Sequence, residues 1–394
     1  MQTNPARPLE MLVLDHLLIL DKSHGHSSGL NVVDVVKHLT ISVSPIEYLA
    51  HCLEGSRSAL TRLESVTSSK VDHLELPIPN SSTLLTYLAG VIHTIVRYRH
   101  HKFDVCVAVN PVNFLSGYML RMLGVTKLVV FYSADYSPTR SQSKYLNYAY
   151  QLVDRFAARH SDASWNVSKQ ICLIRTQQGA KHVHHVPNAP RLSLFQLGKL
   201  AVRKPFSLVY TFPKFSGDIV HKNHMLRWLI DNFSALRQDL PLVRLRLIGL
   251  GNIRGAIEPL VTTKSDLEHI DFMDVRERDT LIQLLCESSI GLALYDLSGG
   301  ASHLAYGDSM KLREYLAAGL PVITTPGHPM ANEINEHKLG YVISTEQSFV
   351  DAVRAIYSNL ELHEQLRERA IRYSHENDIS IILSLALQNL YIAP

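Results

Sequence analysis

The chain has few cysteines and no long apolar run. Its 394 residues include four cysteines, Cys52, Cys106, Cys172 and Cys286, which form neither a CxxC pair nor a zinc-type spacing. We therefore expect reduced thiols that act as packing residues in a cytoplasmic setting. The longest apolar-rich segments, 11–20 and 84–96, are too short and too interrupted to span a bilayer. The N-terminus lacks a basic region followed by an apolar stretch, so it does not resemble a signal peptide.

No low-complexity tract interrupts the sequence. Hydrophobic residues make up 46% of the chain and charged residues 19%, which is near the average for packed soluble domains. These proportions suggest neither a disordered protein nor a fibrous repeat. A chain of this length can form two domains of ordinary size, each with its own core.

Acidic residues are scarce in the first half. Residues 1–195 carry 19 Lys and Arg against 13 Asp and Glu, whereas residues 196–394 carry 20 against 23. The run RYRHHK at 97–102 concentrates the positive charge at the end of an apolar helix. Such a surface suits anionic lipid headgroups or a phosphorylated acceptor. The alternative is a solvated helix C-terminus, which the helix dipole favours.

Apolar strand-like runs alternate with helical periodicity in both halves, which predicts two α/β domains built on parallel sheets. In the first half we expect strands at 11–21, 104–109, 127–132 and 163–167, and helices from about residue 30 and at 82–99, 114–123 and 141–160. In the second half we expect strands at 205–212, 243–251, 269–273, 290–296, 321–325 and 340–343, and helices at 224–236, 278–286, 348–357 and beyond. The turn VPNAP at 186–190 separates the two halves. Ligands of such sheets bind at the carboxyl ends of the strands.

The stretch KLREYLAAGLPVITT at 311–325 reads as a short helix, a glycine stop and a buried strand. Asp308 or Ser309 can cap the helix, and Gly319 ends it. A helix start after Gly307 presents free backbone N–H groups to an anion such as a diphosphate. Glu314 can accept hydrogen bonds from the hydroxyl pair of a sugar, and a surface ion pair with Lys311 is the structural alternative.

This stretch and its neighbours resemble the GT-B glycosyltransferases, in particular the nucleotide-sugar-dependent family 4 enzymes, whose pattern is E-x7-E-A-x-A-x-G-x-P-V. Glu314 matches the second glutamate of that pattern, and AAGLPVI at 317–323 matches its C-terminal part. The segments 186–189, 245–252 and 269–296 resemble other parts of the family pattern, in the same order. The resemblance implies two Rossmann-like domains facing a central cleft. Residues 1–195, completed by helices at 375–394, would bind the acceptor, and residues 196–374 would bind the donor.

The resemblance also implies roles in the donor site. Glu314 would bind the ribose hydroxyls, and Met273 would line the base pocket. Cations and N–H donors are needed where charge develops on the leaving nucleoside diphosphate. These groups would be the backbone at Gly307, Asp308, Ser309 and Met310, and the side chains of Lys222 and Lys311.

Two positions depart from the family pattern. The first glutamate of E-x7-E would fall at position 306, where this chain has Tyr306, so the identity of the donor sugar stays open. Asp308 is the nearest acidic substitute. Lys214 takes the place of an arginine that often precedes the family's Lys-Gly, which is Lys222-Asn223 here.

Three features of the first half suggest an acceptor site. Gly25, Ser28 and Gly29 lie in a loop that resembles the family's glycine-rich loop, although glycine there also suits an ordinary tight turn. Asp135 follows a buried strand and could orient or deprotonate an acceptor hydroxyl, with loop capping as the alternative. Asn110, directly after the strand expected at 104–109, is a second and weaker candidate for the same role.

Histidines are frequent, yet no metal site is expected. His182, His184 and His185 have no carboxylate or cysteine at ligand spacing, and no DxD motif occurs in the chain. We expect no metal and no cofactor, with a nucleotide-diphosphate sugar as the co-substrate.

The sequence thus predicts a metal-independent glycosyltransferase, a retaining one by resemblance, in polysaccharide or glycoconjugate biosynthesis. Its expected partners are a nucleotide sugar and a glycan or lipid-linked acceptor, with no nucleic acid. The expected location is cytoplasmic, with peripheral contact at the anionic inner face of a membrane. Two alternatives stay open: a GT-B subunit without turnover, which Tyr306 suggests, and a GT-B sugar-nucleotide epimerase. A dehydrogenase is disfavoured because no GxGxxG with a distant acidic residue follows a strand.

Overall fold

The chain forms two compact units. The computed structural model describes residues 9–17, 45–52, 57–63, 69–75, 83–141, 143–190, 192–195, 205–212, 224–249, 253–275, 277–297 and 303–392. The first unit comprises Met1–Asn188, Tyr306–Asp308 and Ile379–Pro394, and the second comprises Ala189–Ala305 and Ser309–Asp378. The first break in the chain between the units therefore falls inside the turn at 186–190.

The first unit contains an eight-stranded sheet. Its strand order is β4-β3-β2-β1-β5-β6-β7-β8. The strands are β1 (Met11–Leu17), β2 (Ile46–Cys52), β3 (Arg57–Leu63), β4 (Ser69–Glu75), β5 (Phe103–Val109), β6 (Thr126–Ser133), β7 (Ala163–Asn166) and β8 (Val183–His185). The strands predicted at 104–109, 127–132 and 163–167 are confirmed, as is the one that opens the chain.

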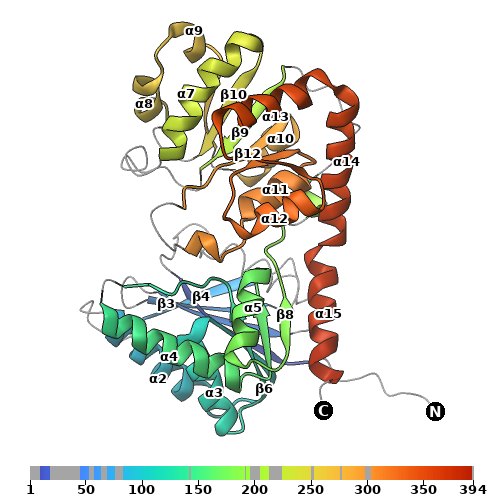
Figure 1. The fold of residues 1–394 in the computed structure, drawn as a ribbon. Coiled ribbons are helices and arrows are strands. Elements are labelled where there is room, and N and C mark those ends of the chain that lie inside the picture. The colour runs from blue at the N-terminus through green and yellow to red at the C-terminus, as the bar shows by residue number, and fades with distance from the viewer. Residues whose placement is uncertain are drawn as a thin grey trace, which may run out of the picture. The chain divides into compact units, whose positions relative to one another are not determined.

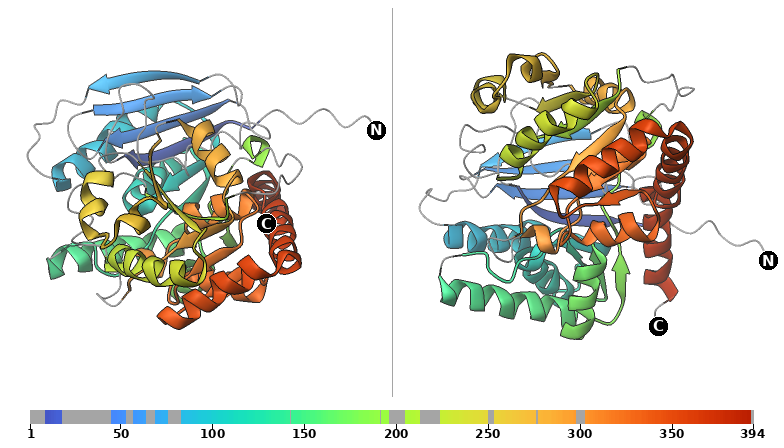
Figure 2. Two further views of the ribbon diagram at one scale, coloured as in Figure 1. Left: turned by 90° about the horizontal axis from the view of Figure 1, so that it is seen from above. Right: turned by 45° about the horizontal axis from the view of Figure 1, so that its top comes forward.

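The expectation of a purely parallel sheet is wrong at one edge. β3 pairs antiparallel with both β2 and β4, and Figure 2 shows this edge in blue. β2 ends at Cys52 and β3 begins at Arg57, which leaves too little chain for the crossover that parallel pairing needs. The edge is therefore a meander added to a parallel sheet.

Helices α2, α3 and α4 lie next to one another on one side of the first sheet (Figure 1). The helices of this unit are α2 (Thr83–Tyr98), α3 (Asn110–Met122), α4 (Lys144–His160), α5 (Lys169–Gln178) and α15 (Ile379–Ile392). The helices predicted at 82–99, 114–123 and 141–160 are confirmed, whereas α5 was not predicted. Ser168 caps α5 by accepting a hydrogen bond from the Ile171 N–H, and Gly179 ends it in a left-handed conformation.

The second unit contains a six-stranded sheet in which every pairing is parallel. Its order is β11-β10-β9-β12-β13-β14. The strands are β9 (Ser207–Thr211), β10 (Arg244–Gly249), β11 (Ile270–Asp274), β12 (Ile290–Ala293), β13 (Val322–Thr324) and β14 (Gly340–Val342). All six were predicted from their apolar runs, and all six are confirmed.

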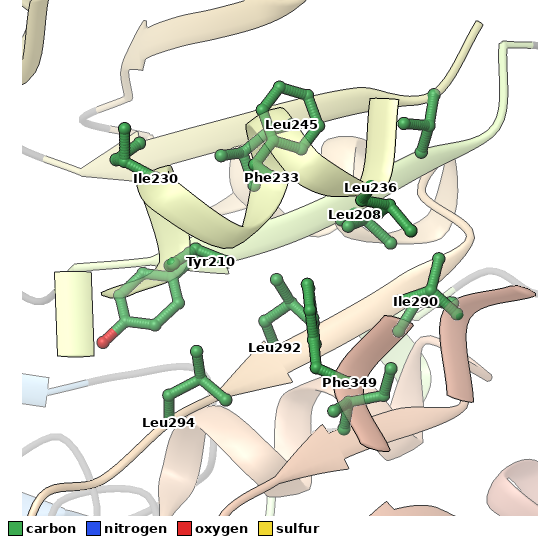
Figure 3. Packing of buried hydrophobic residues seen from close by; sticks show 14 of the residues in the cluster. Leu208, Tyr210, Ile230, Phe233, Leu236, Leu245, Ile290, Leu292, Leu294 and Phe349 are labelled. Atoms are coloured by element: carbon green, nitrogen blue, oxygen red, sulfur yellow. The ribbon is translucent and has the colours of Figure 1, made fainter. Parts of the chain in front are cut away.

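Helices cover both faces of the second sheet. They are α7 (His224–Asp239), α8 (Ile253–Ile257), α9 (Lys264–Leu267), α10 (Arg278–Cys286), α11 (Met310–Ala317), α12 (Pro329–Glu336), α13 (Glu346–Ser358) and α14 (Leu360–Glu376). Figure 3 shows one core, in which Phe233 of α7 and Phe349 of α13 pack with Leu245, Ile290 and other strand residues. A second core joins α10, α11 and α12 to the sheet through side chains that include Ile282, Leu316 and Ile334.

Candidate functional site

Helix α11 begins and ends as its sequence predicts. Ser309 is the cap, because its Oγ accepts a hydrogen bond from the Leu312 N–H at 3.3 Å. The same Oγ lies 2.6 Å from the hydroxyl of Tyr295. The alternative cap, Asp308, is wrong, because its carboxylate accepts from the Asn188 N–H at 2.9 Å instead. The first-turn N–H groups of Met310 and Lys311 have no acceptor within the helix, so this end suits an anion.

Glu314 lies in the middle of α11 and is only 7% exposed. Its Oε1 forms an ion pair with Nη1 of Arg278, the first residue of α10, whose side chain is 35% exposed. An ion pair at Glu314 is therefore present, but its expected partner Lys311 is wrong, because Arg278 takes that place. Lys311 instead places its ammonium 4.2 Å from the centre of the Tyr210 ring.

Arg313, the residue before Glu314, anchors α11 to two neighbouring helices. Arg313 is buried, and its guanidinium donates to the Tyr373 hydroxyl at 2.9 Å and to the Glu333 carboxylate at 3.3 Å. The Tyr373 hydroxyl also donates to Glu333. This buried network joins α11 to α12 and α14, so the helix that carries Glu314 is held in place by its neighbours.

Tyr315 fastens α11 to the sheet. Its hydroxyl accepts a hydrogen bond from the Thr211 N–H at 2.9 Å. Its ring lies against Gly291 of β12, where an added Cβ would come within 2.5 Å of a ring carbon. Only glycine permits this close approach. The helix therefore rests directly on the strand beside it.

Met273 lies on the edge strand β11. It lines a hollow of about 310 Å³ together with Arg254, Leu267, Ile270, Asp271 and Phe272. The guanidinium carbon of Arg254 is 5.8 Å from the centre of the Phe272 ring. The role of Met273 at a base pocket stays a prediction. Lys214 and Lys222, the predicted diphosphate cations, fall outside the described residues.

Residues 306–308 belong by their contacts to the first unit. The Tyr306 ring packs edge-to-face on Tyr136 with centres 5.1 Å apart, and its carbonyl oxygen accepts from the Ser168 hydroxyl. The Asn188 side-chain amide donates to the Asp308 carbonyl at 3.0 Å. Asp308, the predicted acidic substitute, is thus bound to Asn188 through both its carboxylate and its carbonyl, with Gly307 between it and Tyr306.

Polar residues occupy one register level across the carboxyl end of the first sheet. His16 of β1 pairs with His51 of β2, Ser133 of β6 pairs with Asn166 of β7, and Asn166 pairs with His185 of β8. Asn110 follows β5 directly and has a φ of +68°, which is uncommon for a residue other than glycine. Asn113, in the next turn of α3, also reaches this row, since its Nδ2 lies 2.6 Å from His16 Nδ1.

Asp15 and His16, at the carboxyl end of β1, have strongly shifted pKa values. The same Asn113 amide nitrogen donates to the Val109 carbonyl at 2.9 Å, so it is a donor and His16 Nδ1 is the acceptor. Burial lowers the pKa of His16 to about 3 and raises the pKa of Asp15 to about 6. The Tyr48 hydroxyl donates to Asp15 at 2.8 Å. Shifted pairs of this kind mark candidate functional sites.

Asp135, the predicted catalytic residue, lies just beyond β6 with its side chain 42% exposed. Its Oδ1 accepts a hydrogen bond from Arg140 at 2.6 Å. Asn110 Oδ1 is buried and has no partner among the described residues. Gly25, Ser28 and Gly29 fall outside the described residues, so the structure leaves their role a prediction. No sequence motif pointed to Asp15, His16 or Arg278, because each reads as part of an ordinary strand or helix.

Within the described ranges, no group of three His, Cys, Asp or Glu side chains could hold a metal ion. His184 and His185 lie in the short strand β8. Cys106 is buried, and Cys172 and Cys286 are half-buried, each as a free thiol. Among the same residues, no helix is both long and apolar enough to cross a membrane.

Residues 214–359 match the family model described as glycosyl transferases group 1. This segment contains α11, Glu314 and most of the second unit. The match confirms, over that segment, the resemblance that the sequence motifs indicated. A search among curated proteins found no match.

Solved structures match almost the whole chain. Sucrose-phosphate synthase from Thermosynechococcus elongatus has a TM-score of 0.68 at 12% identity, covering 98% of this chain and 100% of that one. α,α-Trehalose 6-phosphate synthase from Burkholderia multivorans has the same TM-score and identity, covering 98% and 96%. HepE of Anabaena in complex with UDP-glucose has a TM-score of 0.62 at 14% identity, covering 97% and 99%. These likenesses confirm the predicted fold, with two Rossmann-like α/β domains.

Proposed function

We propose that this GT-B protein, whose residues 214–359 match the group 1 glycosyltransferases, transfers a sugar from a nucleotide-diphosphate sugar to an acceptor hydroxyl. The observation that carries the proposal is the geometry of α11. A buried carboxylate, Glu314, lies one turn beyond a helix start whose backbone N–H groups have no acceptor within the helix. HepE, which has the same fold, is named as a complex with UDP-glucose.

Different groups of α11 are proposed to bind different parts of the donor. The N–H groups at Met310 and Lys311 and the positive end of the helix dipole bind the diphosphate. Glu314 accepts hydrogen bonds from the ribose hydroxyls. Its pairing with Arg278 favours the ionised carboxylate, which is the form that only accepts. The network of Arg313, Glu333 and Tyr373 holds this helix in place and so fixes the distance between the two groups.

On the acceptor side, we propose that Asp135 orients the attacking hydroxyl. Arg140 holds its carboxylate at 2.6 Å, which leaves the second oxygen to accept a hydrogen bond from the hydroxyl and so to orient it. The reaction is proposed to be metal-independent and to retain the anomeric configuration, with the leaving phosphate taking the acceptor's proton. The acceptor is proposed to be a glycan or a lipid-linked sugar in polysaccharide or glycoconjugate biosynthesis.

The location proposed for this reaction is the inner face of an anionic membrane. The excess of Lys and Arg over residues 1–195 supports it, because such an excess attracts anionic headgroups. Contact is proposed to be peripheral.

Nucleotide release tests the reaction. The protein is incubated with UDP-, GDP- and ADP-sugars, with and without an acceptor extract, and the free nucleoside diphosphate is measured. We expect release with one nucleotide class and an increase when acceptor is present. Glu314→Ala is expected to abolish it, whereas Glu287→Ala, an exposed glutamate at the other end of α10, leaves it unchanged.

Two outcomes would replace this proposal. Nucleotide binding without release under every condition would indicate a GT-B subunit without turnover. An epimerase needs no acceptor. If NMR shows that the protein converts a UDP-sugar into its epimer in the absence of acceptor, the protein is an epimerase.

A further inference from the structure

Helix α2 exposes an apolar side and buries a more polar one, which is the reverse of an ordinary amphipathic helix on a protein surface. The side it buries carries Thr86, Gly90, Thr94 and Tyr98, which recur every four residues. The side it exposes is apolar and consists of Leu85, Leu88, Ile92 and Val96. Ile92, in the middle of this line, is 62% exposed. A water-facing helix normally shows the reverse pattern, so an exposed apolar line of this kind marks a candidate interaction surface.

The apolar surface continues onto the two helices next to α2. α3 packs between α2 and α4, and Figure 1 shows the three together. Further large apolar or aromatic side chains are exposed on α3 and α4. We call the whole set the outer helical face: Leu85, Leu88, Ile92, Val96, Met119, Met122, Tyr145, Tyr148 and Leu152.

This face has charge of one sign. α2 and α3 contain no acidic residue, and the single one in α4, Asp154, is buried against Arg175. Exposed cations stand on the same helices or at their C-terminal ends: Arg99, Lys102, Lys144, Arg155 and Arg159. Two carboxylates at the border, Asp104 and Asp162, are already paired with Lys127 and Arg121 at 2.7 and 2.8 Å.

We infer that the outer helical face docks on the surface of an anionic lipid bilayer. Apolar and aromatic side chains enter the boundary between headgroups and acyl chains, while the cations at the helix ends meet anionic headgroups. A second copy of this chain fits less well, because it would bring like charges together with no carboxylate to offset them. The inference deepens the proposed membrane location, and it does not depend on the sugar-transfer reaction.

Vesicle flotation of the full chain tests the inference. The probes are vesicles of phosphatidylcholine alone and of phosphatidylcholine mixed with phosphatidylglycerol. We expect the protein to float with the mixed vesicles and not with the neutral ones, and to bind less as salt is raised. Each cation removed should lower the partition coefficient about five-fold.

Matched variants assign the binding to the face. Ile92→Ser with Leu88→Ser, and separately Arg99→Glu with Lys102→Glu, should each reduce flotation at least about ten-fold. Leu173→Ser, at an equally exposed leucine on α5, and Arg227→Glu, on α7 of the second unit, serve as controls and should float like the parent. Circular dichroism should show the fold retained in all of them, since every changed side chain is exposed.

Three results would overturn the inference. The first is equal binding to both vesicle types or to neither. The second is parental flotation of the α2 variants. The third is a dimer in solution that Leu88→Ser with Ile92→Ser dissociates while vesicle binding stays absent, because the face would then be a protein interface. None of these results bears on nucleotide release, so the proposed reaction is judged separately.

Discussion

At the scale of single residues, the ion pair between Arg278 and Glu314 holds the carboxylate of the proposed donor site in place. The carboxylate is almost fully buried, and the arginine that pairs with it comes from a different helix. A buried charge without a partner is costly, so the buried Glu314 carboxylate is stabilised by the arginine beside it. The spacing of the motif could locate Glu314 from the sequence. It could not locate Arg278, because the pair forms only when α10 and α11 pack together.

We predict that Arg278→Ala lowers the free energy of unfolding by about 1 to 2 kcal/mol, since the arginine is partly exposed and solvent replaces part of its contribution. It should also weaken nucleotide binding. Chemical denaturation and calorimetry measure the two effects. Arg254→Ala, which breaks an exposed ion pair with Glu258, is the control and should change stability by less. If the two variants lose the same free energy of unfolding, the ion pair of Arg278 with Glu314 contributes no more to stability than an exposed ion pair.

At the scale of elements, the second unit could be predicted almost strand by strand. Its strands are buried, so they appear in the sequence as short apolar runs bounded by turns. The antiparallel edge at β2, β3 and β4 was missed because its residues are mixed in polarity. Helix α12 was missed because it is short and opens with Pro329. The position of α11 was predicted correctly, yet its network with Glu333 and Tyr373 joins residues too far apart in sequence to be inferred.

The contact of α11 with β12 gives the next prediction. Gly291→Ala should destabilise the second unit by about 1 to 3 kcal/mol, because the new Cβ would overlap the Tyr315 ring. Denaturant unfolding measures the loss. Gly255→Ala, in the exposed part of α8, is the control and should be neutral or slightly stabilising. If Gly291→Ala is also neutral, α11 does not rest directly on the strand.

At the scale of the whole molecule, buried titratable groups make stability depend on pH. Burial lowers the pKa of His16 to about 3 and the pKa values of His51 and His328 to about 4. The unfolded chain therefore binds more protons than the folded one between about pH 4 and 6.5, so stability falls as pH falls through that range. Asp15 acts in the opposite direction, since its folded pKa of about 6 favours folding at lower pH. Three histidines against one aspartate leave a net loss in acid.

We expect the free energy of unfolding to drop by about 1 to 3 kcal/mol per pH unit near pH 5. Urea denaturation over a pH series measures the slope. His51→Gln removes one titrating group and should therefore reduce the slope by up to about 1.4 kcal/mol per pH unit. Leu173→Gln, at an exposed residue without a titratable group, is the control and should leave the slope as it is. Stability that is flat or rises toward acid would contradict the assignment of these groups as neutral in the fold.

The most direct test of the donor site is the affinity of Glu314→Ala for nucleoside diphosphates, measured by titration calorimetry with UDP, GDP and ADP. Glu314→Gln is the companion variant, because it keeps the size of the side chain and removes only the charge. We predict that the parent protein binds one of the three, that both variants lose at least about ten-fold in affinity, a cost of about 1.4 kcal/mol, and that circular dichroism shows the fold retained. Unchanged affinity in the two folded variants would contradict the claim that α11 is the donor site.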